Sequence, residues 1–300
     1  MAWVGGRARR LGVASERLSP ILALAPAFAI LAVFFYGFIC WTIYISFTTS
    51  RMLPRYEFAG LANYRFLLAN DRWGLAYTNL LVFAAIFIVG ALVLGFFTAV
   101  LVDRAGSASG FYRTLLLYPL SISWLATGLL WQWLLNPSFG IERSVRDLGF
   151  TNFTFDWLVG QDTAIYTLVF AALWHMTGLV MAIFLAGLRG IDDDIWRATR
   201  IEGIPTWRVY IHVILPMLRP YVLTVVMLLS FGVVRLFDLV IAMTGGGPGF
   251  ATDMPALFMY DQTFTRSRLG VGAASAVMIL LTTAAVIAPY LYLELRKQPR

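Results

Sequence analysis

Charged residues are scarce in this sequence. Only 13% of its 300 residues are Asp, Glu, Lys or Arg, while 60% are hydrophobic and the mean hydropathy is +0.76. A soluble domain carries about 25% charged residues, so this chain has too little polar surface to cover a water-soluble particle of its size. Much of its exterior must therefore face lipid. The composition also excludes a disordered chain, a coiled coil and a disulfide-stapled secreted domain.

Lysine, cysteine and histidine are nearly missing as well. Lys297 is the only lysine, and its place near the chain end suits neither a phosphate-binding P-loop nor a Schiff-base enzyme. Cys40 is the only cysteine, which excludes an intramolecular disulfide. The two histidines are too far apart in the sequence for a recognisable metal-ligand spacing. We therefore expect no catalytic residue, no metal site, no cofactor and no nucleotide hydrolysis in this chain.

Long hydrophobic runs dominate the rest of the sequence. A helix needs roughly 20 mostly apolar residues to cross the hydrocarbon layer, and six runs are long enough. The first follows a basic stretch like the n-region of a signal peptide, but it is too long for an h-region and is interpreted as an uncleaved span. The expected spans are 21–47, 77–102, 111–135, 164–188, 216–243 and 270–293. The fold class is therefore all-α, a polytopic membrane protein with six transmembrane helices.

The loops between these spans are short, and no repeat or linker divides the chain. We distinguish a cytoplasmic N-terminal segment (1–20), a first helix with its outer loop (21–72) and a core of five spans (73–295). Arginine and lysine are moderately enriched on one side of the membrane, which predicts that both termini are cytoplasmic. The outer loops are too short to hold an extracellular enzyme domain.

The longest cytoplasmic loop, 190–220, has the pattern of a helix, a turn and a second helix. Its three aspartates at 192–194 precede an apolar-periodic segment, as acids do at a helix N-terminus. Gly203 and Pro205 then end the helix before the pattern resumes. The residues alone fit two interpretations. The loop is either an amphipathic connector at the membrane surface or a helix that docks in a groove of a cytosolic partner.

This loop resembles the EAA loop of ABC importer permeases, patterned as E-A-A-x-x-D-G-A followed by a hydrophobic helix and L-P-x-x-x-P. The matching positions are Arg197, Ala198, Thr199, Glu202, Gly203, Leu215, Pro216 and Pro220. In that family the loop is the coupling helix seated in the ATPase subunit. Here Arg197 replaces the first glutamate of the pattern, so a contact made by that glutamate would be charge-reversed. Thr199, Glu202 and Ile204 are further departures from the pattern.

Two more segments resemble sugar-uptake permeases of this family. The residues Phe237-Asp238 and Met243-Thr244-Gly245-Gly246-Gly247-Pro248 match a segment that ends the fifth span, where glycines permit positive φ and proline stops the helix. The run Phe58-Ala59-Gly60-Leu61-Ala62-Asn63-Tyr64 matches one that follows the first span. The segments 131–137 and 289–291 further resemble the glucose/mannose branch.

The resemblance implies an importer-permease (MetI-like) fold in the bacterial cytoplasmic (inner) membrane. It implies four kinds of partner: a second homologous permease, an ATPase subunit dimer that uses ATP and Mg, an extracytoplasmic sugar-binding protein, and the lipid bilayer. No nucleic acid is expected. The transported substrate would be a monosaccharide or a sugar derivative, released by the binding protein and moved into the cytoplasm.

Three polar side chains lie at membrane depth, where a charge costs about 2.5–3.5 kcal/mol on insertion scales. Arg235 and Asp238 are three residues apart on one face of the expected fifth span. They form either a mutually neutralising pair or a contact for substrate hydroxyls. His175 in the fourth span is either a buried histidine satisfied by a neighbouring helix or a substrate contact.

Two other classes of function are weighed against the importer permease. A stand-alone secondary transporter or channel for small polar solutes would favour inverted repeats or a chain of intramembrane acids. Asp238 is the only clear intramembrane acid, and no repeat is visible. A membrane enzyme would need a nucleophile–base motif or a metal set, and neither is found.

Overall fold

The computed structural model describes residues 24–297 of the chain, so the predicted N-terminal segment 1–20 lies outside the described residues. Within that range the regular structure is helical, apart from an isolated antiparallel bridge between Thr48 and Phe58. Helices long and apolar enough to cross a membrane are Leu24–Ser46, Asp71–Arg104 (α4), Ala164–Arg189 (α8) and Leu269–Tyr290, the last within α15 (Leu269–Lys297). Two bent helix pairs raise the described spans from 4 to 6 if each pair crosses once.

Four of the expected spans are continuous helices, as predicted. The first contains a π-turn, η1 (Ala32–Tyr36), followed by α2 (Gly37–Ser46). The second, α4, is longer than predicted because the Asn70 side chain caps it, accepting a hydrogen bond of 3.2 Å from the Trp73 amide. Arg104 ends α4 in its last turn, where a cation favours the helix dipole.

The third expected span is bent, not straight. It consists of η2 (Gly106–Ala108), α5 (Ser109–Leu117) and η3 (Tyr118–Ser121), followed by α6 (Trp124–Leu134) at 98° to them. The turn follows Pro119, and Ser123 starts the new helix by accepting a hydrogen bond from the Ala126 amide. The prediction of one continuous helix over 111–135 is therefore wrong.

The fifth expected span is broken twice. Thr206–Met217, which includes α10 (Thr206–Val209), η4 (Tyr210–Ile214) and α11 (Leu215–Met217), meets α12 (Arg219–Val234) at 69°. After α12 the chain leaves helical geometry at residues 235–237 and resumes as α13 (Asp238–Met243). The prediction of a continuous helix over 216–243 is therefore wrong as well. Pro220 at the start of α12 fits the first break, since proline favours a helix N-terminus.

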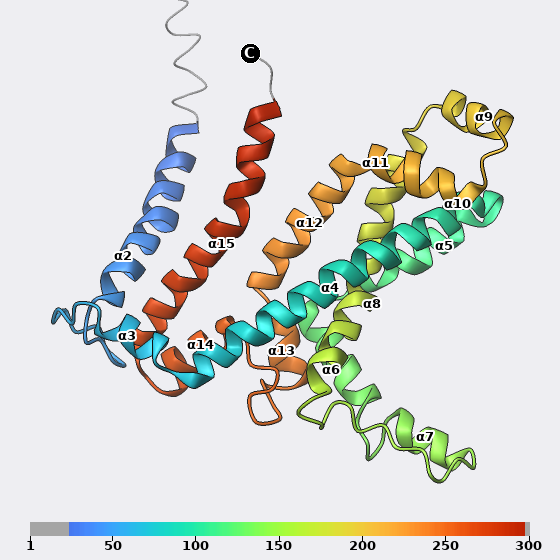
Figure 1. Ribbon diagram of the computed structural model, residues 1–300. Helices are drawn as coiled ribbons and strands as arrows, with labels where there is room; N and C mark the ends of the chain where they lie inside the picture. The colour runs from blue at the N-terminus through green and yellow to red at the C-terminus, as the bar shows by residue number, and fades with distance from the viewer. Residues whose placement is uncertain (1–23, 298–300) are drawn as a thin grey trace, which may run out of the picture.

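The core lies where α4 packs along α8, with α6, α12 and α13 around them (Figure 1). Glycines let these helices approach closely, as is common within membranes. A Cβ on Gly95 of α4 would collide with Val180 of α8, and one on Gly128 of α6 would meet Ala242 of α13 at 2.7 Å. Phe83 and Phe184 are among the largest fully buried side chains.

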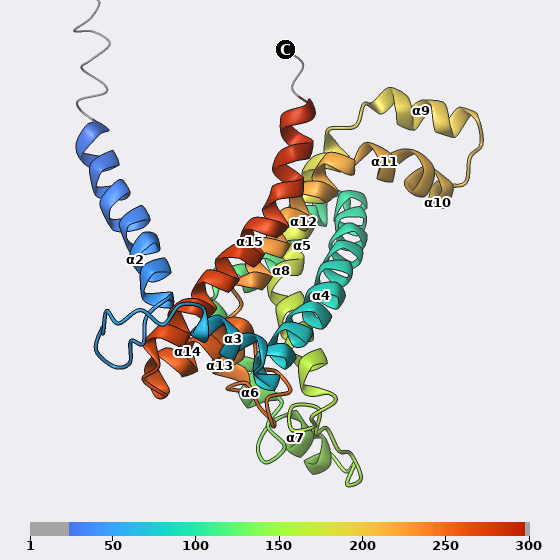
Figure 2. The same cartoon turned by 60° about the vertical axis from the view of Figure 1, so that its left-hand side comes forward.

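Short helices complete the fold. At one end of α4 are α3 (Ala62–Leu68), α14 (Pro255–Tyr260) and η5 (Asp261–Thr265), and α7 (Ile141–Asp147) lies apart from them near α6. At the opposite end, α9 (Asp193–Ile201) and α10 extend away from the bundle, as Figures 1 and 2 show. The 190–220 loop is thus presented at one extremity of the molecule.

Candidate functional site

The 190–220 loop forms the predicted helix, turn and helix. Asp192 caps α9 by accepting a hydrogen bond of 2.9 Å from the Asp194 amide. Gly203 follows the helix with a φ of +65°, a conformation that strongly favours glycine. Pro205 then stands directly before α10. The acids, the glycine and the proline therefore have the structural roles that the sequence indicates.

The outward surface of this loop carries the residues singled out from the sequence. Arg197, Ala198 and Glu202 are exposed, while Thr199 is buried against the rest of the loop. Arg197 pairs with Asp194 at 3.1 Å, but both side chains are exposed, so the pair stabilises the helix little. Ile201 is 87% exposed beside them. A partner protein that covered α9 would therefore bury apolar surface.

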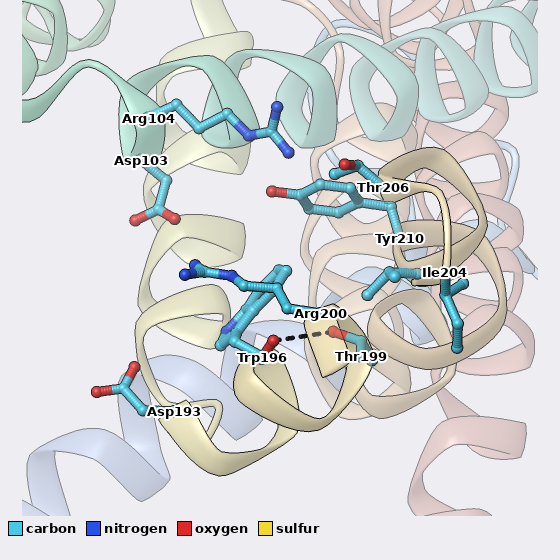
Figure 3. A pocket seen from close by; sticks show the side chains of 10 residues that line it. Asp103, Arg104, Asp193, Trp196, Thr199, Arg200, Ile204, Thr206 and Tyr210 are labelled. Atoms are coloured by element: carbon cyan, nitrogen blue, oxygen red, sulfur yellow. Dashed lines mark hydrogen bonds between the residues drawn. The ribbon is translucent and has the colours of Figure 1, made fainter. Parts of the chain in front are cut away.

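The inward side of the loop encloses a cavity of about 440 Å³ against the end of α4 (Figure 3). Trp196 of α9 and Tyr210 of η4 meet edge to face there, with ring centroids 5.6 Å apart. Arg104 of α4 reaches toward the Tyr210 ring, with its guanidinium carbon 5.2 Å from the centroid. Thr199 lies in the same wall and donates a hydrogen bond to the Trp196 carbonyl. These aromatic contacts join three separate elements, so no local sequence pattern predicts them.

Arg235 and Asp238 do not share a helix face, because the break at 235–237 separates them. No ion pair joins them among the described residues, and both side chains are exposed. The Arg235 guanidinium lies over the Phe231 ring, 5.3 Å from its centroid. The expected arrangement on one face of a continuous helix is therefore wrong, and the neutralising pair is not formed. Both charges lie on the surface of this chain beside a helix break.

His175 is buried between α8 and α6, with only 3% of its surface exposed. Its ring stacks on Trp124 at 4.0 Å, and its Nδ1 atom is 3.0 Å from the Thr127 hydroxyl. This environment fits a histidine satisfied by a neighbouring helix. Close by, Trp131 packs edge to face on Trp174, and its indole Nε1 is buried without a hydrogen-bond partner. The Trp131 indole N–H therefore has no hydrogen-bond acceptor in the described part of the chain, whereas His175 has a hydrogen-bond partner in Thr127.

The glycine run after α13 forms the predicted helix exit. Gly245 and Gly246 have φ values of +61° and +88°, and a Cβ on Gly246 would meet Leu257 at 2.8 Å. In the matched segment 58–64, Asn63 donates two hydrogen bonds, of 2.8 Å to the Ser46 carbonyl and 2.9 Å to the Thr48 carbonyl. This amide ties α3 to the end of the first span.

The sequence is similar to a known family and to several known proteins. Residues 91–298 match the family described as binding-protein-dependent transport system inner membrane component. A probable ABC transporter permease of Pyrococcus horikoshii is 34% identical over 93% of this chain and 97% of its own. A xylose/arabinose import permease of Haloferax volcanii is 32% identical over 90% of this chain and 86% of its own. A glucose import system permease of Saccharolobus solfataricus is 27% identical over 92% of this chain and 96% of its own.

The fold also matches a solved structure. A bacterial ABC transporter involved in the import of the acidic polysaccharide alginate superposes with a TM-score of 0.82. The match covers 97% of this chain and 100% of the other, at 14% sequence identity. At that identity the likeness establishes the fold, which is that of an importer permease.

Proposed function

Since this chain belongs to the binding-protein-dependent transport system inner membrane component family of ABC transporter permeases, we propose that it is the transmembrane subunit of a sugar importer. It would receive a monosaccharide or sugar derivative from an extracytoplasmic binding protein and conduct it into the cytoplasm. Relatives named for xylose/arabinose and for glucose import support the sugar class. The observation that carries the proposal is the projecting α9 loop, with its family-like residues on the exposed side.

The exposed loop gives this chain a means of receiving energy from a partner. Each of two separate ATPase subunits would hold one permease loop, this chain supplying one and a second homologous permease the other. The ATP and Mg would be bound by the ATPase. Arg197, Ala198, Glu202 and Gly203 are at the surface of the loop, whereas Thr199 faces the cavity behind it. Ile201 and the exposed Trp207 would supply the apolar part of the contact.

The location follows from the same arrangement. A loop that binds an ATPase must be cytoplasmic, which places α9 and α10 inside and the helix exit after α13 outside. Both termini would then be cytoplasmic, in agreement with the arginine and lysine distribution. The membrane would be the cytoplasmic (inner) membrane of a bacterium.

The break in the fifth span supports a place on the substrate pathway. Irregular backbone at membrane depth is tolerated where it is buried in protein or lines a water-filled cavity. Arg235 lies in this break and Asp238 directly follows it, and both side chains are exposed on this chain. They would therefore line the pathway and form hydrogen bonds with sugar hydroxyls. His175 would not contact the sugar itself. It would instead hold Trp124 and Thr127 in place behind the pathway.

The coupling role is tested by replacing Gly203 with aspartate in the complete transporter. A side chain at φ +65° strains the turn after α9, so Gly203→Asp should reduce both co-purification with the ATPase and sugar uptake. Gly60→Asp is a matched control, because Gly60 has a similar φ of +56°, the nearest atom is 3.9 Å from its Cβ position, and it lies shortly before α3, at the other end of α4. If Gly203→Asp retains both ATPase binding and uptake, the coupling role is wrong.

A further inference from the structure

The α4 helix joins two clusters that the proposed function does not use. It has 34 residues and, at 1.5 Å per residue, spans roughly 50 Å. One end lies against the 190–220 loop, and the other lies against the segment that precedes and forms α14, as Figure 1 shows. Each end is fastened by side chains distant in the sequence.

The fastening at the loop end is aromatic. Tyr210 packs edge to face on Trp196 of α9, and its ring centroid lies 6.1 Å from that of Phe96 on α4. Arg104, also on α4, covers the same ring, a cation–π contact. Tyr210 is thus held between α9 and α4. A displacement of α9 toward α4 would press this ring against α4.

The fastening at the opposite end is ionic. The Arg72 guanidinium in the first turn of α4 binds Asp253 with an Nε–Oδ2 distance of 2.6 Å, and it also binds Asp261. The Asp253 side chain is fully buried, and burial raises the pKa of its carboxyl while Arg72 opposes that rise. Asn79, two turns further along α4, donates to the carbonyls of Phe250 and Asp253 at 3.1 and 3.0 Å. The segment from Phe250 to Asp261 is therefore held on α4.

The helix between the two fastenings is built as a stiff body. It has no proline and no break between Asp71 and Arg104. Its buried face, which includes Phe83, Phe87, Ala91 and Ala99, packs along α8, and Gly95 brings the two backbones close together. A packed interface of this kind moves as a unit and does not bend locally.

We infer that α4 carries the movement of the 190–220 loop to the outer segment Phe250–Asp261, with Tyr210 and Arg72 as the positioning residues at its two ends. This inference rests on the proposed function, since it needs an ATPase that moves α9. It goes beyond it by assigning the element and the contacts that link the cytoplasmic loop to the outer face. If the two clusters only stabilised the fold, a substitution at Tyr210 would not change how the outer segment responds to ATP.

The test uses the complete transporter in lipid vesicles, with ATPase, second permease and binding protein, in a Cys40→Ser background. A reporter cysteine at Phe264, which is exposed in η5 just after Asp261, reads the outer segment through its rate of maleimide labelling. A second reporter at the exposed Leu148, after α7, has no described link to α4 and serves as the control site. Labelling is compared with and without ATP and Mg.

In the parent, ATP should change the labelling rate at position 264. Tyr210→Ala removes the ring and should abolish that change. It should also raise the ATP hydrolysed per sugar imported by about tenfold, the size of a typical coupling between two sites. Tyr210→Phe keeps every ring contact and should behave as the parent. Tyr112→Ala, at an exposed tyrosine whose ring partner is the neighbouring Phe111, should do so too.

The results separate two failures. If the parent imports sugar and position 264 still responds to ATP in Tyr210→Ala, the inference is wrong while the proposed function stands. The same holds if Tyr210→Phe behaves like Tyr210→Ala, because the ring contacts would then not be the cause. If the parent imports no sugar and no reporter responds to ATP, the proposed function fails and the inference fails with it.

Discussion

His175 illustrates how a polar side chain is accommodated inside a membrane helix bundle. It is buried, stacked on Trp124, and hydrogen-bonded to Thr127 of the next helix. A buried polar group that loses its partner costs about 1–3 kcal/mol, whereas removal of both partners costs much less. The pair is therefore suited to hold α6 against α8.

We expect His175→Leu to lower the stability of the protein by about 1–3 kcal/mol, because it leaves the Thr127 hydroxyl without a partner. The double variant with Thr127→Val should recover part of this loss. Thermal unfolding midpoints of the two variants and the parent in one detergent measure the effect. A change in sugar preference with no change in the midpoint would instead make His175 a substrate contact.

Single residues differ in how far the sequence predicts their surroundings. Gly203 and Asp192 act within their own loop, so local spacing was enough to assign their structural roles. Arg72 and Asp253 are 181 residues apart in sequence, and no local pattern pairs them. The contacts of Tyr210 likewise depend on how α4 and α9 pack together. Such contacts can be predicted only once the fold is known.

Hydropathy predicts where the membrane helices lie in the sequence, but not where they bend. The apolar runs at Leu24–Ser46, α4, α8 and α15 identify four continuous helices correctly. The 98° turn near Pro119 lies inside a helix pair that is apolar enough to cross a membrane, and the break at 235–237 lies inside the expected span 216–243. The Ser123 cap helps to set the first of these turns, and a hydropathy average does not register such a cap.

The close contact between α4 and α8 leads to a prediction about Gly95. Gly95→Ala places a methyl group against Val180 and should cost roughly 1–3 kcal/mol of stability through overpacking. Gly74→Ala is the matched control on the same helix, because nothing lies within 4 Å of its Cβ position. The midpoint of thermal unfolding in detergent should fall for the first variant only. Equal midpoints would show that the two helices separate without strain.

The break in the fifth span leads to a prediction about Arg235. If Arg235 faces the substrate pathway, Arg235→Met should lower sugar uptake while the protein still reaches the membrane and assembles. Uptake into vesicles and co-purification of the partners measure the two effects separately. Arg51→Met, at an exposed arginine distant from the break, is the control. Loss of assembly with uptake per complex unchanged would contradict the pathway role.

At the scale of the whole molecule, the fold places its exposed loop and its buried ion pairs at opposite ends of one long helix. In the proposed function, the energy for transport would come from a partner ATPase. The apolar helices make this a membrane protein, and the family match makes it a permease.

The most direct measurement of this account is sugar uptake by reconstituted vesicles. The chain is assembled with its ATPase, second permease and binding protein, and radiolabelled monosaccharide uptake is followed with ATP, without ATP, and with the chain alone. We predict uptake only when all four components and ATP are present. Uptake by this chain alone, driven by a proton or sodium gradient, would contradict the account and favour a stand-alone secondary transporter.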